Sequence, residues 1–335
     1  MSSRVEDARN AQPIPAPVRL LIAGAGLFGR EHLARLVGRT EVEVVGVADT
    51  SDEALAQVRS RYPIANCSVD PLRMIDNTPA DAISVATPAE SHVEICARAL
   101  GAGLCVLLEK PVAASVAAAV QLQAATRGSR GFVMPGHVLR FAGDHRRLVD
   151  IVRAGRIGEV LYVGSRRYRD DSHAVRYPDT DPILQTLIHD IDLAQWITGS
   201  SFRAVHARRS GGPGFRSMTA ISATTAMGVT CELRTAWTFP GADAPADRLE
   251  VVGSRGSVEL FVGQTIHVYS GGQRLEYPAD EADDPLRSEQ DHFLRCVVDR
   301  SCPPALGLFE ATEGLKLADA ALESLRLQRE TLILV

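Results

Sequence analysis

Hydrophobic positions in the first 135 residues form short apolar runs separated by amphipathic segments. Such runs suit strands buried on both faces of a parallel sheet, and the segments between them suit helices. Repeated strand–helix alternation predicts right-handed crossovers and a doubly wound α/β fold. We expect strands at residues 18–23, 42–48, 81–87, 104–108 and from 131 to 134 onward, and helices at residues 30–36, 51–60, 90–100 and 111–125.

The pattern changes near residue 137. Longer strand-like runs follow, separated by Gly and Pro turns with few helices between them, which is typical of an antiparallel sheet in an α+β domain. We therefore expect a mobile tail over residues 1–16, a first domain over 17–137 and a second over 138–335. The second domain's expected strands are 160–167, 202–209, 219–239, 248–253, 257–262 and 265–269, and its expected helices are 138–154, 183–197, 288–299 and 309–330.

Composition adds limits on the class of protein. The chain has 335 residues, of which 45% are hydrophobic and 23% charged, an ordinary globular mixture that is long enough for two cores. A net charge of -5 with interspersed signs argues against nucleic-acid and membrane-surface partners. There is no apolar stretch of about 18 residues and no signal-peptide segment, so we expect a cytoplasmic protein.

Cysteine and lysine usage are both informative. The cysteines form no C-x-x-C pair and no Cys/His cluster of zinc-ligand spacing, so we expect small core residues and no metal site. Of 36 basic residues only Lys110 and Lys316 are lysine, and arginine fills the other cationic positions. The six cysteines are Cys67, Cys96, Cys105, Cys231, Cys296 and Cys302.

A glycine-rich segment follows the first expected strand. Gly24-Ala25-Gly26-Leu27-Phe28-Gly29 is a G-x-G-x-x-G motif between a strand and a helix. Gly24 permits the tight turn, Gly26 lets the backbone approach a pyrophosphate, and Gly29 lets helix and strand pack closely. Free N–H groups and the helix dipole favour phosphates at this helix start. The context predicts a dinucleotide site that includes Leu27 and Phe28.

The second strand ends at Asp49, 20 residues after Gly29. A carboxylate there accepts hydrogen bonds from ribose hydroxyls and repels a 2′-phosphate, which favours NAD over NADP. The alternative is a cap for the following helix. Thr87 and Pro88 end a later strand, and with His92 they are expected to line the nicotinamide side, because ligands lie beyond the carboxyl ends of such strands. The alternative for His92 is an exposed position on the following helix.

Several ordered motifs together resemble the glucose–fructose oxidoreductase / inositol dehydrogenase / rhizopine catabolism (Gfo/Idh/MocA) family. The resemblance implies a Rossmann domain, then an open-faced, mostly antiparallel sheet for substrate binding and for homodimers or homotetramers. It also implies a catalytic lysine at Lys110 that reaches the substrate oxygen and the nicotinamide, so that both Glu109 and Lys110 are expected cofactor contacts. The motifs are the glycine segment, Thr87-Pro88 with His92, Glu109-Lys110-Pro111, Gly136 with Arg140-Phe141, Gly155, His189-Asp190-Ile191-Asp192, and Ala320-Ala321 with Ser324.

Lys110 and His189 are the expected catalytic residues. An ammonium is a compact donor that can exchange a proton, which a guanidinium cannot, and an imidazole titrates near neutrality. Asp192 lies close to the same helix face as His189 and is expected to orient that helix or the lysine loop. The alternatives are a surface lysine, which the scarcity of lysine argues against, and a core histidine.

One position departs from the family. Many members carry an Asp four residues before this histidine, where the chain has Gln185. A glutamine cannot accept a proton at neutral pH, so the Asp–His pairing of polyol dehydrogenases is missing. Asp181 is a candidate substitute, although Pro182 follows it and the helix is able to begin there.

A polar segment over residues 170–180 precedes the helix of His189. Polar loops beside a cleft often supply substrate contacts, and the arginines here hint at an anionic substrate such as a sugar acid or sugar nucleotide. The alternative is a solvated loop. The expected substrate contacts are Arg140, Arg169, Tyr177, Gln185 and His189, with Arg167, His173 and Arg176 as further candidates.

These features predict an NAD(P)-dependent oxidoreductase. It would transfer a hydride between nicotinamide and a secondary alcohol or ketone of a sugar, polyol, sugar acid or sugar nucleotide. Two alternatives remain. One is a glycoside hydrolase or lyase of the same fold that retains its NAD, and the other is a non-catalytic NAD-binding regulator.

Overall fold

The computed structural model describes residues 16–211, 216–241, 244–279 and 283–333, and nearly all of the expected tail lies outside this part. The chain separates into two compact units. The first holds the described residues up to Glu109 together with Ala124–Met134 and Gln290–Ala305. The second holds Lys110–Gln123, Pro135–Glu289 and the remainder from Leu306.

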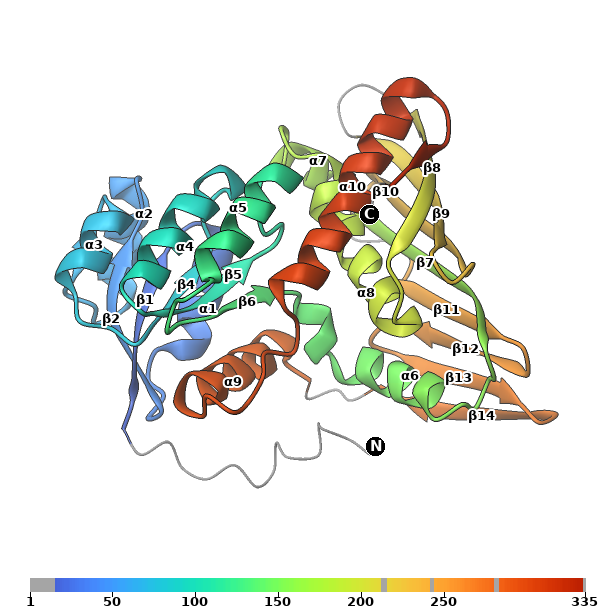
Figure 1. The fold of residues 1–335 in the computed structure, drawn as a ribbon, viewed down its shortest axis with the longest axis horizontal. Coiled ribbons are helices and arrows are strands. Elements are labelled where there is room, and N and C mark those ends of the chain that lie inside the picture. The colour runs from blue at the N-terminus through green and yellow to red at the C-terminus, as the bar shows by residue number, and fades with distance from the viewer. Residues whose placement is uncertain (1–15, 212–215, 242–243, 280–282, 334–335) are drawn as a thin grey trace. The chain divides into compact units, whose positions relative to one another are not determined.

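The first unit contains a six-stranded sheet in the order β3-β2-β1-β4-β5-β6, and its registered pairs are parallel (Figure 1). The doubly wound fold is therefore confirmed. Its strands are β1 (Val18–Ala23), β2 (Val42–Ala48), β3 (Cys67–Ser68), β4 (Ala82–Val85), β5 (Cys105–Glu109) and β6 (Val133–Gly136). The accompanying helices are α1 (Leu27–Leu36), α2 (Asp52–Arg61), α3 (Pro71–Asn77) and α4 (His92–Gly101). Most of the next helix, α5 (Val116–Thr126), belongs to the second unit.

Several of these elements differ from the sequence expectation. The helix α1 begins at Leu27 rather than at residue 30, and α5 begins at Val116 rather than at residue 111, since residues 111–115 form bends. Neither β3 nor α3 was expected. A local signal for α3 was available, since the Asp70 side chain accepts hydrogen bonds from the backbone N–H groups of Leu72 and Arg73.

The second unit contains a nine-stranded sheet in the order β14-β13-β12-β11-β7-β10-β9-β8-β15. Only β7 and β10 pair in parallel among its registered pairs, so the expected mostly antiparallel sheet is confirmed. The strands are β7 (Val160–Asp170), β8 (Phe202–Gly211), β9 (Ser217–Thr225), β10 (Thr230–Phe239), β11 (Arg248–Gly253), β12 (Gly256–Phe261), β13 (Thr265–Ser270), β14 (Gln273–Pro278) and β15 (Thr331–Leu332).

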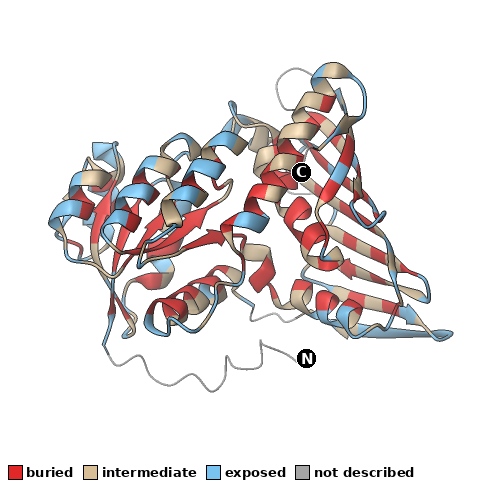
Figure 2. Cartoon of the chain, in the orientation of Figure 1, coloured by how far each residue is buried: buried red, intermediate tan, exposed pale blue. Residues whose placement is uncertain are grey.

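The expected single run over 219–239 is wrong. It is a hairpin of β9 and β10, because Gly228 adopts a φ of 86° in the turn between them. The strand β14 was also missed. Its side chains are largely exposed, so it lacks the hydrophobic alternation that marks a half-buried strand (Figure 2).

Helices α8 (Ile188–Thr198) and α10 (Leu308–Leu327) contact each other, and both contact strands of the large sheet. The π-helical turn Ile183–Leu187 precedes α8, where one continuous helix was expected. The expected helix over 138–154 is divided into a 3-10 turn, Val138–Phe141, and α6 (Gly143–Arg153). A short helix, α7 (Ser172–Arg176), lies in the expected loop, and α9 spans Pro285–Val298. In the described part of the chain, no helix combines the length and hydropathy of a membrane span.

Candidate functional site

The glycine turn of the first unit has the geometry that a pyrophosphate requires. Gly24 adopts a φ of 97°, and a Cβ on it would lie 2.5 Å from the carbonyl oxygen of Ala86. A Cβ on Gly29 would lie 1.9 Å from the oxygen of Gly24, so α1 and the turn pack as the motif predicts. At Gly26 a Cβ would meet nothing within 4 Å, which leaves space beside the start of α1.

Leu27 and Phe28 begin α1 and expose 49% and 39% of their surfaces, so the turn presents apolar side chains as well as free N–H groups. The residues at this turn therefore fit a bound dinucleotide. The phosphates would meet the N-terminus of α1, and no bulky side chain fills the approach at Gly26.

Asp49 lies at the end of β2 and joins this turn to the next one. One carboxylate oxygen accepts a 2.6 Å hydrogen bond from the N–H of Ala25, and the other accepts 2.8 Å from the N–H of Ser51. The N-cap of α2 is Ser51, whose hydroxyl accepts from the N–H of Ala54. Asp49 thus connects the glycine turn to the N-cap of α2, and these two hydrogen bonds fix the position of its carboxylate.

His92 is buried, so an exposed helix position is wrong. Its Nε2 lies 2.8 Å from the carbonyl oxygen of Thr87. The Ser91 hydroxyl lies 2.8 Å from the Thr87 hydroxyl and 2.9 Å from the carbonyl oxygen of Pro88. His92 therefore fixes the conformation of the Thr87-Pro88 segment.

Glu109 makes a buried contact that the sequence did not indicate. Its Oε1 lies 3.0 Å from Nε2 of His32 on α1, and both residues are buried. Nδ1 of His32 lies 3.2 Å from the amide of Gln290. The last residue of β5 is thereby linked to the helix that begins at the glycine turn. His32 stands three residues after Gly29, but its role depends on a partner 77 residues away.

Lys110 belongs to the second unit, where it contacts the segment leading into α8. Its ammonium donates a 3.1 Å hydrogen bond to the backbone carbonyl of Gln185, and the Lys110–Pro111 bond is cis. His189 stands in the first turn of α8. Lys110 is one of the cations that act on the His189 ring, so the two expected catalytic residues share one electrostatic environment.

The pKa of His189 is lowered well below 6.5, first by burial and then by the positive charges of Lys110, Arg167, His137 and Arg169. Its ring lies edge-on to that of His137, with centroids 6.4 Å apart. Nδ1 of His189 is buried and has no hydrogen-bond partner among the described residues. A neutral imidazole is therefore held in the electrostatic field of an ammonium.

Arginine–carboxylate pairs surround α8. Arg140 makes a buried bidentate pair with Asp192, with contacts of 2.8 to 3.1 Å, so Asp192 ties α8 to the 3-10 turn Val138–Phe141. Asp181, the candidate substitute for the missing Asp, is paired with Arg209 at 2.7 and 2.8 Å and accepts from the N–H of Ile183. Asp181 is thus occupied by structural contacts.

A second arginine–carboxylate network includes Asp190 of α8. Arg167 contacts Asp190 at 3.1 Å and Asp247 at 2.7 Å, and Arg169 makes a bidentate pair with Asp247. Burial opposes the charge on Asp247, but hydrogen bonds from Arg169 and the charge of Arg167 lower its pKa. A pocket of about 330 Å³ next to this network is lined by Tyr168, Arg169, Asp170, Ala244, Pro245, Ala246, Asp247 and Val262.

The polar segment before α8 forms an aromatic group. His173 and Tyr177 lie 5.8 and 6.3 Å from the ring of buried Trp237, whose indole N–H donates to the hydroxyl of Thr186. Arg176 is exposed on α7. Tyr177 is thus held by contacts with the rings of His173 and Trp237.

A family model described as "Oxidoreductase family, NAD-binding Rossmann fold" matches residues 18–137, and one for the GFO/IDH/MocA C-terminal domain matches residues 145–259. Inositol 2-dehydrogenase 2 of Saccharopolyspora erythraea is 31% identical over 253 residues, 73% of this chain and 74% of that protein. The chain belongs to the GFO/IDH/MocA family. As a family member it is an NAD-dependent oxidoreductase that acts on CH–OH groups, and the sequence-based prediction of cofactor and reaction class is confirmed.

Solved structures agree in fold with this GFO/IDH/MocA protein. An oxidoreductase from Agrobacterium radiobacter in complex with NAD+, L-tartaric acid and magnesium has a TM-score of 0.86 at 16% identity, covering 95% of this chain and 99% of that one. The scyllo-inositol dehydrogenase from Lactobacillus casei with bound NAD(H) and scyllo-inositol has a TM-score of 0.80 at 18% identity, with coverage of 95% and 99%. At such identities the likeness concerns the fold.

Proposed function

We propose that the protein oxidises a secondary alcohol of an uncharged cyclic polyol or sugar, with Lys110 and His189 as its catalytic residues. The observation that carries this proposal is the ammonium of Lys110 held on the Gln185 carbonyl, just ahead of a neutral His189 on α8. Lys110 also follows directly on Glu109, the last residue of a strand in the dinucleotide-binding sheet.

The charge balance around α8 favours an uncharged substrate. Arg167 pairs with Asp190 and Asp247, and Arg169 pairs with Asp247. These two candidate substrate contacts therefore carry little surplus positive charge. Arg140 is likewise neutralised by Asp192. A substrate carboxylate would compete with partners already in place, whereas hydroxyl groups would not. The names of the inositol dehydrogenases among the relatives agree with this choice.

His189 and Lys110 have separate roles in the proposed reaction. A neutral His189 accepts the proton of the reacting hydroxyl, and the Lys110 ammonium stabilises the negative charge that develops on its oxygen. NAD+, when bound, supplies the ring that accepts the hydride. The cations that lower the pKa of His189 keep its lone pair available at neutral pH. Gln185 contributes its backbone carbonyl to Lys110 rather than a carboxylate to His189.

The test is NADH formation from NAD+ with myo-inositol, scyllo-inositol, D-glucose and the matched acid D-glucuronate. We expect turnover of a neutral compound to exceed that of the acid, and NADP+ to be the poorer cofactor. Preference for glucuronate would overturn the uncharged substrate. Glycosidic cleavage without net NADH would favour the NAD-retaining hydrolase or lyase, and NAD binding without turnover would favour the regulator.

The remaining assignments are part of the same proposal. The cofactor contacts are Asp49, Thr87, Pro88, His92 and Glu109 with the glycine turn, and Tyr177 and Gln185 are substrate contacts. The domain over 138–335 would bind substrate and form a homodimer or homotetramer in the cytoplasm. Light scattering and cell fractionation test these two statements.

A further inference from the structure

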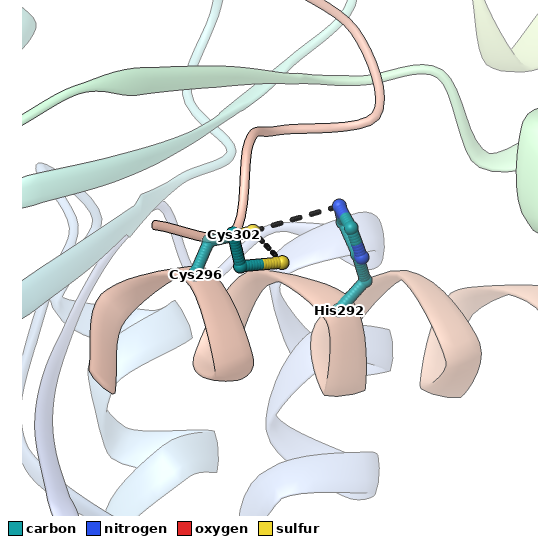
Figure 3. A group of neighbouring side chains, drawn as sticks. All are labelled: His292, Cys296 and Cys302. Atoms are coloured by element: carbon teal, nitrogen blue, oxygen red, sulfur yellow. Dashed lines mark hydrogen bonds between the residues drawn. The ribbon is translucent and has the colours of Figure 1, made fainter. Parts of the chain in front are cut away.

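Three metal-ligating side chains come together on α9, in the part of it that belongs to the first unit. They are His292, Cys296 and Cys302, and their ligand atoms all lie within 4.8 Å of one another. Figure 3 shows His292 and Cys296 on successive turns of the helix, with Cys302 returning to them from the segment after its end. None of the three is used in the proposed reaction.

We propose that these residues form a zinc site. Sγ of Cys296 lies 3.5 Å from Nε2 of His292 and 3.4 Å from Sγ of Cys302. Bonds of about 2.3 Å to sulfur and about 2.0 Å to nitrogen at tetrahedral angles place two sulfurs about 3.8 Å apart, and sulfur and nitrogen about 3.5 Å apart. The two separations that involve Cys296 therefore differ from the zinc-bound values by no more than a few tenths of an ångström.

The chemistry of the three groups fits zinc better than a disulfide. All six cysteines are free, and sulfurs in a disulfide are separated by about 2.05 Å. An imidazole has no role in a disulfide, whereas two thiolates and an imidazole are a ligand set that zinc prefers. The imidazole of His292 also hydrogen-bonds to the backbone of Pro303, the residue after Cys302.

Burial raises the pKa of the Cys296 thiol, so the protonated form is favoured while no cation is bound. A bound Zn²⁺ reverses this preference, since coordinated thiols are deprotonated. The nearby Cys105 is not offered as a fourth ligand because Arg300 donates a hydrogen bond to its sulfur. The site would have three protein ligands and one position for water.

The expected role is to fasten the chain after α9. Asp299 to Cys302 form the turn that brings the third ligand back, and the Asp299 carboxylate accepts from the N–H and hydroxyl of Ser301. A metal that joins Cys302 to His292 and Cys296 closes this turn onto the helix and stabilises the folded state by mass action. The site would act on stability and leave turnover unchanged.

The experiment uses the full chain, stripped of metal under reducing conditions and titrated with Co²⁺ as a spectroscopic probe and then with Zn²⁺. We expect one Co²⁺ per chain with thiolate-to-cobalt charge-transfer absorption, displaced by Zn²⁺, and a higher melting temperature with Zn²⁺. Cys302→Ser and His292→Gln should lose the absorption and the shift while retaining NADH binding. Cys67→Ser removes a half-buried cysteine elsewhere and should behave as wild type.

Equal cobalt absorption in the wild type and in Cys302→Ser would overturn the proposal. So would the absence of any cobalt absorption, or a Cys296–Cys302 disulfide in peptide maps of protein purified without reductant. NADH binding in each variant reports separately on folding and on the proposed function.

Discussion

The ammonium of Lys110 donates a 3.1 Å hydrogen bond to the backbone carbonyl of Gln185, four residues before His189. This contact ties the residue after β5 to the turn that starts α8. It uses a backbone group, so it does not depend on the side chain that departs from the family pattern. Lys110 is therefore anchored even though residue 185 carries no carboxylate. The missing carboxylate instead affects the electrostatic environment of His189.

Lys110→Ala should lower kcat at least about a hundredfold, because it removes the charge that stabilises the developing alkoxide. The chain offers a matched control in its other lysine. Lys316 pairs with Glu313 on α10, away from the proposed catalytic residues in the sequence, so Lys316→Ala should retain wild-type turnover. Steady-state NADH formation measures both variants. Full turnover by Lys110→Ala on a verified substrate would refute its catalytic role.

The rate of alcohol oxidation should fall on the acid side only below pH 6.5. Burial and nearby cations lower the pKa of His189, so its base form persists to a pH below the ordinary histidine value of 6.5. Protonation at still lower pH removes the acceptor, and the rate then declines. A pH profile of kcat/KM tests this, and an acid limb centred above 6.5 would contradict it.

Removing one of those cations should raise the pKa of His189. In Lys110→Met the positive charge is gone while much of the side-chain volume remains. The histidine resonances, assigned with His189→Asn, can be titrated by NMR. We expect an upward shift relative to the wild type and none in Lys316→Met. An unchanged His189 would mean that burial alone sets its pKa.

Gln185→Asp should restore a carboxylate four residues before His189 and so raise the pKa of the imidazole, because a negative charge stabilises the protonated ring. The acid limb of the oxidation profile should move to higher pH. Gln185→Asn has the same side-chain length without the charge and should leave the limb where it is. Identical profiles for the two variants would show that this side chain is too far from His189 to act.

Much of the fold could be predicted because its signals are local. The glycine turn, the apolar strands and the Ser51 cap each depend on residues within a few positions of one another. The hairpin of β9 and β10 was missed because its strands continue the same apolar pattern on either side of Gly228. The π-helical turn at Ile183–Leu187 has no counterpart in hydrophobic periodicity either.

The site was predicted less completely because its contacts join distant parts of the sequence. Arg140 was expected to meet substrate, and nothing near it in the sequence identified Asp192, 52 residues away, as its partner. Glu109 was expected at the cofactor, and nothing near it identified His32 as its partner. Such pairings require the tertiary fold, whereas residue type alone indicated only that these groups were charged.

Asp49→Ser should weaken the preference for NAD over NADP. The carboxylate repels a 2′-phosphate, so its removal lowers the NAD/NADP ratio of kcat/KM by roughly tenfold, on the order of one charged hydrogen bond. The variant also loses the hydrogen bonds that the Asp49 carboxylate accepts from the backbone N–H groups of Ala25 and Ser51. Asp52→Asn, an exposed carboxylate in the first turn of α2, is the control and should keep the ratio. An unchanged ratio in Asp49→Ser would place the ribose elsewhere.

Two alanine substitutions in the glycine turn should separate cofactor binding from folding. At Gly26 the backbone is in the extended region at φ −62° and ψ −167°, and an added methyl group meets no atom within 4 Å. Gly26→Ala should therefore keep the wild-type melting temperature. Its methyl group would occupy the approach of the pyrophosphate, so the Kd for NADH should rise at least about tenfold, which is about 1.4 kcal/mol.

Gly29→Ala should instead lower the melting temperature of the protein itself. Its methyl group would lie 1.9 Å from the carbonyl oxygen of Gly24, which is backbone and cannot rotate away, so α1 must shift. Overpacking of this kind costs about 1–3 kcal/mol, and the melting temperature should fall before NADH is added. Thermal unfolding with and without NADH distinguishes the two variants. Normal NADH affinity in Gly26→Ala would mean that the pyrophosphate does not cross this turn, and an unchanged melting temperature in Gly29→Ala would mean that α1 does not pack against it.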